Sequence, residues 1–209
     1  MSSSKSDREP DIDPPVDLLR RYEEMVATQI ETINEIDEKA ATTMRIVAIL
    51  LGVILSGFTI LVDTGVITDV ESTPVAVGWF VIGLGTLLLS IGLAIFTYLS
   101  SRFEYGPGIE WGNVLANYRV EPDDYASTLL DGYTQALKQN RTVVRGNSRR
   151  FRNSLIALLH GMTATSTAFG LFLLPVPFQW SLAVSVAVIV ALLVVTNYLV
   201  REEHLLIEN

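Results

Sequence analysis

The chain has 209 residues, of which 49% are hydrophobic, and its mean hydropathy is +0.38. Soluble domains of this size are rarely so apolar, and the clustering of the apolar residues indicates membrane spans. The formal net charge of −8 argues against nucleic acid as a partner, because phosphate binding requires clustered cations. The chain has no cysteine, which excludes disulfides, thiolate metal sites and a cysteine nucleophile.

The choice of charged residues is also uneven. Only three of the fifteen cations are lysines, whereas 23 residues are acidic. An acidic, lysine-poor and cysteine-free composition is typical of a high-salt cytoplasm. We therefore expect a halophilic archaeal source.

The N-terminal 45 residues are predicted to form a tail and a long helix. Residues 1–12 are rich in serine and charge, which favours a disordered acidic tail over a signal peptide. Asp13 and Pro14 suit the cap and the first position of a helix. Apolar residues then recur every seven positions, as in a helix that pairs with another helix. We predict a cytoplasmic helix over residues 13–45 that continues into the membrane, with the candidate pairing residues Leu19, Val26 and Ile33.

Residues 46–99 contain two apolar stretches, Ile46–Val62 and Val75–Leu99. The second exceeds the roughly 18–20 residues that cross a bilayer as a helix, and the first just reaches that length. Each stretch should be helical, because irregular backbone in lipid would leave amide groups without partners. The segment is predicted to be a transmembrane hairpin.

The second half of the chain repeats this plan. Glycines and a proline in residues 100–120 predict an irregular cytoplasmic loop, and residues 121–153 predict a second cytoplasmic helix. Residues 154–200 contain two more apolar stretches and predict a second transmembrane hairpin, followed by a cytoplasmic tail over residues 201–209. The candidate pairing residues of the second helix are Leu130, Leu137 and Val144. Three polar residues in the companion rows, which we expect to set register or oligomer state, are Gln29, Asn140 and Asn147.

The cations predict the orientation of the spans. Six lie in residues 1–45, eight in residues 100–153 and one in the tail, whereas the two short turns between paired spans contain none. Cytoplasmic segments of membrane proteins are enriched in Lys and Arg. We therefore expect a multi-pass protein of the cell membrane with both termini in the cytoplasm.

The third span is unusually polar, because it contains the run HGMTATSTAFG. Its candidate functional residues are His160, Thr163, Thr165 and Ser166. Small residues spaced four apart favour close helix packing, with a pore lining as the alternative. For His160, an interhelical hydrogen bond competes with a role in proton handling.

The sequence offers no pattern typical of an enzyme or a metal site. The two histidines, His160 and His204, have no nearby carboxylates or cysteines at a metal-binding spacing. No nucleophile with its base and no phosphate-binding loop is recognisable. We therefore expect a non-enzymatic protein without cofactor or metal.

The stretch INEIDEKAATTMRIVAILLGVILSG resembles the start of the membrane domain of Pycsar-type effectors. In that family an acid-x-basic-Ala element precedes the first span, and Asp37, Lys39 and Ala40 match it. YTQALKQNRTVVRGNSRRFRNSLIALLHG is similar to the helix that enters the family's next membrane segment. The resemblance implies an effector of antiphage signalling that damages the membrane after a cyclic pyrimidine nucleotide is sensed.

These observations predict an all-α integral membrane protein with four transmembrane helices in two hairpins, each preceded by a long cytoplasmic helix. From the residues alone, the favoured function is self-assembly or binding of a protein partner through the cytoplasmic helices, with the lipid bilayer as surroundings. The alternative is a membrane-disrupting or pore-forming effector of a nucleotide-signalled antiviral defence system.

Overall fold

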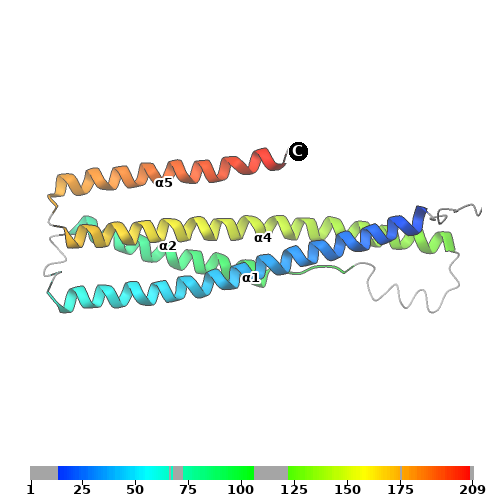
Figure 1. Cartoon of the computed structure of the whole chain (residues 1–209), viewed down its shortest axis with the longest axis horizontal. Helices are drawn as coiled ribbons and strands as arrows, with labels where there is room; N and C mark the ends of the chain where they lie inside the picture. The colour runs from blue at the N-terminus through cyan, green and yellow to red at the C-terminus, as the bar shows by residue number, and fades with distance from the viewer. Residues whose placement is uncertain (1–13, 66, 68–72, 106–121, 175, 208–209) are drawn as a thin grey trace, which may run out of the picture. The chain divides into compact units, whose positions relative to one another are not determined.

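The computed structural model of the chain describes residues 14–65, 67, 73–105, 122–174 and 176–207. Within them the regular structure is entirely helical, and each helix is long and apolar enough to cross a membrane. This confirms the prediction of an all-α protein with four membrane-length helices. The helices are shown in Figure 1: α1 (Pro14–Asp63), α2 (Pro74–Leu99), α4 (Pro122–Leu173) and α5 (Phe178–Ile207).

Several helix ends have a local cause in the sequence. Three helices begin at a proline. Proline has no backbone N–H, and this costs nothing in the first turn of a helix, where an N–H would have no carbonyl partner within the helix. After α1, Gly65 adopts a φ of 72°, a left-handed conformation that glycine reaches without steric cost. The Gly65 N–H donates to the carbonyl of Val62, and the Thr64 N–H donates to that of Ile60. The turn therefore pairs the last carbonyls of α1.

Helices α1 and α4 run unbroken through both of the compact units into which the chain divides. Unit 1 contains residues 1–37 and 100–148, and unit 2 contains residues 38–99 and 149–209. The predicted disordered tail, residues 1–12, lies outside the described residues, as does most of the predicted loop over residues 100–120. The predicted tail over residues 201–209 begins as a continuation of α5, which ends at Ile207.

The core of unit 2 is formed by α1, α2 and α4. In Figure 1, α4 runs between α1 and α5 in this part of the molecule. Phe58 of α1 stacks on Phe80 of α2 with ring centroids 4.4 Å apart, and Phe172 of α4 lies 5.9 Å from Phe58. Val47 of α1 and Leu87 of α2 are completely buried. The outward side chains are largely apolar, as expected for segments surrounded by lipid.

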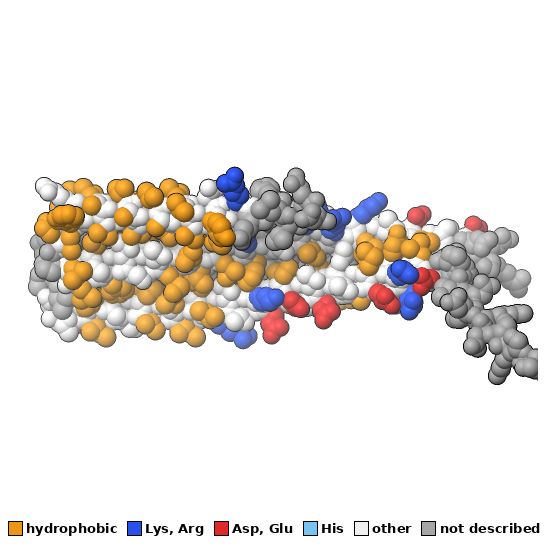
Figure 2. Space-filling model, turned by 45° about the horizontal axis from the view of Figure 1, so that its top comes forward, with side chains coloured by type: hydrophobic (Ala, Val, Ile, Leu, Met, Phe, Trp, Pro, Cys, Tyr) orange, Lys and Arg blue, Asp and Glu red, His pale blue; other side chains and the backbone are white. Residues whose placement is uncertain are grey.

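Charged side chains avoid the apolar stretches of the helices. After Arg45, α1 contains no charged residue until Asp63 at its end. On the face shown in Figure 2, hydrophobic side chains cover the apolar stretches, and the visible Lys, Arg, Asp and Glu side chains lie outside them. This distribution matches the cost of placing a charge in hydrocarbon.

The most deeply buried residues of α4 in unit 1 are not the large apolar residues that recur every seven positions. Leu130, Leu137 and Val144 are half-buried, whereas Asn140 and Asn147 of the companion row are fully buried. This row continues into unit 2 as Ser154, Gly161 and Ala168, all of them buried. Small and amide side chains occupy the innermost positions because the neighbouring backbone approaches α4 closely there.

Candidate functional site

Helices α2 and α4 approach each other closely at two glycines. A Cβ atom added to Gly83 would lie 2.8 Å from the backbone nitrogen of Thr165, and one added to Gly161 would lie 2.6 Å from Cγ of Leu87. Real Cβ atoms essentially never approach a neighbour this closely. The contact therefore depends on glycine at both positions, as in tightly packed membrane helices.

A pair of serines joins the same two helices. The Ser90 hydroxyl donates to the Ser154 carbonyl at 2.8 Å, and the Ser154 hydroxyl donates to the Ser90 carbonyl at 2.8 Å. Both side chains are completely buried. The reciprocal bonds satisfy two hydroxyls that would otherwise be costly to bury.

The polar residues predicted on the third span have different surroundings. Thr163 donates to the Leu159 carbonyl and Thr165 to the Gly161 carbonyl, so both hydroxyls bond to the preceding turn of α4. Thr165 is buried against α2, whereas Ser166 is exposed. His160 bonds to another helix, since its Nε2 lies 2.8 Å from Oγ1 of Thr196 in α5. The structure thus brings Thr165 and His160 into helix contacts and does not gather the four residues into one site.

Helix α5 is joined to the rest of unit 2 by a second polar contact, which the sequence analysis missed. The indole N–H of Trp79 donates to the Ser185 hydroxyl at 2.7 Å, and Ser185 donates in turn to the Ser181 carbonyl. Trp79 and Ser185 lie in separate apolar stretches of the sequence, and the residue spacing did not identify them as partners.

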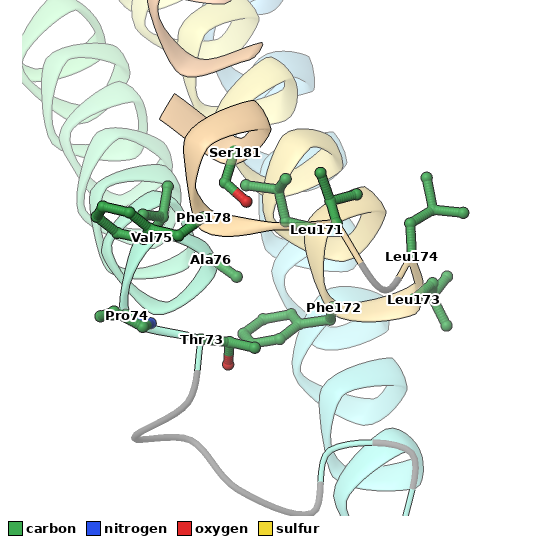
Figure 3. A pocket seen from close by; sticks show the side chains of 11 residues that line it. Thr73, Pro74, Val75, Ala76, Leu171, Phe172, Leu173, Leu174, Phe178 and Ser181 are labelled. Atoms are coloured by element: carbon green, nitrogen blue, oxygen red, sulfur yellow. The ribbon is translucent and has the colours of Figure 1, made fainter. Parts of the chain in front are cut away.

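Unit 2 also contains a pocket at one end of the helices, shown in Figure 3. Its volume is about 330 Å³, and it lies between the start of α2, the end of α4 and the start of α5. Leu171 and Phe172 form one wall, and Thr73, Pro74 and Ser181 lie around them. The described lining contains no charged residue.

Unit 1 contains a buried polar network around residues 100–104, which directly follow α2. The side-chain amide of Asn140 donates to the Glu104 carbonyl at 2.8 Å and accepts from the Glu104 N–H at 2.9 Å. Asn147 accepts from the Ser100 hydroxyl at 2.8 Å and donates to the Ser101 hydroxyl at 2.9 Å. We call residues 100–104 the strap. The two asparagines bind the strap to α4, and their predicted role in register or oligomer state stays a prediction.

The network extends to α1 through Asp37. The Ser101 hydroxyl donates to a carboxylate oxygen of Asp37 at 2.7 Å. Burial raises the pKa of Asp37 above its usual 3.8, and the hydrogen bond from Ser101 opposes that shift. Of its motif neighbours, Lys39 is exposed and Ala40 is completely buried. The strap therefore connects the acidic residue of the predicted motif to α4.

The predicted pairing residues lie along the contact between α1 and α4 in unit 1. Val26 and Ile33 are buried, and Leu19 is half-buried. Gln29 donates to the Leu137 carbonyl at 3.5 Å, and its side-chain oxygen is buried without a partner among the described residues. The two helices thus contact each other within one chain in this unit.

The family model of the Pycsar effector protein domain matches residues 21–175. The chain belongs to this family. No curated protein and no solved structure matches it.

The Pycsar effector domain includes all of the strap network and both of the glycines that bring α2 and α4 together. It includes α2 and α4 and ends before α5, which begins at Phe178. The described residues contain no group of three potential ligands that could hold a metal ion. His204 lies outside the residues whose side chains are described. The halophilic archaeal source stays a prediction, since the family match does not test it.

Proposed function

We propose that this Pycsar effector domain protein is the membrane effector of a nucleotide-signalled antiviral defence system, and that it acts by opening or disrupting the cell membrane. The observation that carries the proposal is the family match over residues 21–175. The four membrane-length helices support it, because a domain of this kind requires direct contact with lipid. In this proposal the protein has no catalytic activity of its own.

The proposed topology has two hairpins, α1 with α2 and α4 with α5. Both termini and the polar halves of α1 and α4 lie in the cytoplasm. The distribution of cations supports this, since the described turn around Thr64 and Gly65 has none whereas the strap contains Arg102. Unit 1 would then be the part of the protein that a cytoplasmic signal reaches.

The other candidate function is assembly or partner binding through the cytoplasmic helices without membrane damage. The heptad spacing on α1 favours it. Val26 and Ile33 are, however, already buried within one chain. A partner that used the same residues would have to displace α4, so we place this function second.

Dye release from vesicles tests the effector function. The purified full chain is reconstituted into vesicles that contain a self-quenching dye, over a range of protein-to-lipid ratios, with and without a cyclic pyrimidine nucleotide. We expect release in at least one of these states, and none from vesicles prepared without protein. Intact vesicles in every state would contradict the effector function and favour assembly alone.

A further inference from the structure

Helix α5 is held to the rest of unit 2 by two polar contacts with a gap between them. Ser185 accepts the Trp79 indole N–H, and Thr196 bonds to His160. The two α5 residues are eleven positions apart, which corresponds to about 16 Å along a helix. Among the α5 side chains whose burial is described, only Ser181 and Ser185 are buried. Between these contacts the partly buried Val188 packs against the core, whereas most other α5 side chains are exposed.

The space left between α2, α4 and α5 is an apolar groove of about 490 Å³. Its polar lining groups already have partners. Thr86 donates to the Ile82 carbonyl, Ser185 bonds to Trp79, and His160 bonds to Thr196. The groove lining consists otherwise of apolar side chains and glycine, including Val75, Gly78, Ile82, Ala164, Ile189 and Leu193.

Two occupants fit this groove poorly. Water in a cavity needs two to four polar partners per molecule, and the lining groups have little hydrogen-bonding capacity left. A helix from a second copy of the chain would be about 10 Å wide with its side chains, so a 16 Å length would occupy about 1,250 Å³. That is well above the volume of the groove.

We propose that the groove between α2, α4 and α5 binds an acyl chain of a membrane lipid. All three bounding helices are long and apolar enough to cross a membrane, so hydrocarbon surrounds the groove. A flexible chain is narrow enough to enter between α5 and the other helices, and it needs no hydrogen bond. The bound chain contacts the exposed α5 side chains that line the groove, Ile189 and Leu193. The α2 and α4 walls of the groove lie within residues 21–175 and α5 lies outside them, and the proposal does not rest on the proposed effector function.

Fluorescence quenching by brominated lipids tests this site, because Trp79 lies in the groove wall and is only 9% exposed. The substitutions Trp111→Phe and Trp180→Phe leave Trp79 as the single tryptophan of the full chain. The protein is reconstituted into phosphatidylcholine vesicles whose acyl chains are either plain or brominated. We expect brominated chains to remove most of the Trp79 emission.

Two glycines of α2 provide a matched pair of variants. Gly78 lines the groove and Gly92 does not, and a Cβ atom at either position would have no neighbour within 4 Å. Gly78→Leu fills the groove and should restore most of the Trp79 emission in brominated vesicles. Gly92→Leu should leave the quenching unchanged. Ile189→Phe fills the groove from α5 and provides a second test if Gly78→Leu does not fold.

Three results would overturn the proposal. Trp79 could show no quenching, so that no lipid chain reaches the groove. Quenching could be equal in the Gly78→Leu, Ile189→Phe and Gly92→Leu proteins, so that lipid reaches Trp79 from elsewhere. Protection that increases with the protein-to-lipid ratio would instead show that a second copy of the chain occupies the groove.

Discussion

At the scale of single residues, Gly83 and Gly85 of α2 have opposite surroundings although they are two positions apart. A Cβ atom at Gly83 would meet the Thr165 backbone at 2.8 Å, whereas one at Gly85 would have no neighbour within 4 Å. Gly83→Ala should destabilise the protein by about 1–3 kcal/mol, because a backbone atom must shift. Gly85→Ala should stabilise it by up to about 1 kcal/mol, because alanine favours the helix. The measurement is helical circular dichroism during SDS titration, and equal effects would contradict the close contact.

Asp37 should make the stability of unit 1 depend on pH. Burial raises the pKa of Asp37 in the folded state, whereas in the unfolded chain the pKa is near 3.8. The folded protein therefore keeps the carboxyl proton at pH values where the unfolded chain has lost it. The stability linked to the proton is fully present below the unfolded value and is lost as pH rises through the raised one. Asp37→Asn should therefore raise the melting temperature at about pH 7, and the gain should shrink toward about pH 4.

The control for this prediction is Glu38→Gln, which removes an exposed carboxylate at the next position. Melting temperatures of both variants are compared with the wild type across the same pH range. An Asp37→Asn gain that is constant with pH, or that grows toward low pH, would contradict the role of burial. A loss of stability at every pH would indicate that the Ser101 contact requires a charged acceptor.

The sequence showed which polar residues the third span contains, but it did not show which groups these residues bond to. The polar character of the third span was visible, but the spacing could not show that Thr163 and Thr165 bond within α4 while His160 reaches α5. A hydroxyl can bond to the preceding turn of its own helix whatever its surroundings. Which neighbour approaches a side chain depends on the packing of the helices, and periodicity does not contain that information.

At the scale of elements, the strap depends on the amide of Asn140. This side chain bonds to both backbone groups of Glu104 and is completely buried. Asn140→Ala should speed hydrogen exchange at the Glu104 amide about fivefold, because the lost bond is worth about 1 kcal/mol. Asn153→Ala, at an exposed position of the same helix, should leave that rate unchanged. Unaltered exchange in both variants would show that other contacts hold the strap.

The long helices were predictable because their apolar stretches and proline starts are local signals. Each of α1 and α4 was predicted as one unbroken helix, and each is unbroken. The most deeply buried positions of α4 were harder to predict from the sequence. Heptad analysis placed Asn140 and Asn147 in the companion row of the seam, but it could not show that the strap bonds to them.

At the scale of the whole molecule, the charge pattern bears on how the chain crosses the membrane. The described residues from Ile46 to Val62 and from Pro74 to Leu99 contain no charge, and Asp63 lies at the end of α1. A helix without charge can lie in hydrocarbon without ion pairing. The cations flanking these stretches therefore provide the signal for orientation, and that signal can be tested directly in cells.

The absence of cysteine makes this test clean, since an introduced thiol is the only one in the chain. Thr64 lies in the turn after α1 and Arg102 in the strap, and both are exposed. A maleimide that cannot cross membranes should label Thr64→Cys in intact cells, because this turn is proposed to face outward. It should label Arg102→Cys only after permeabilisation, and the cysteine-free protein should remain unlabelled throughout. Labelling of both positions in intact cells, or of neither, would contradict a hairpin of α1 and α2 that spans the membrane twice.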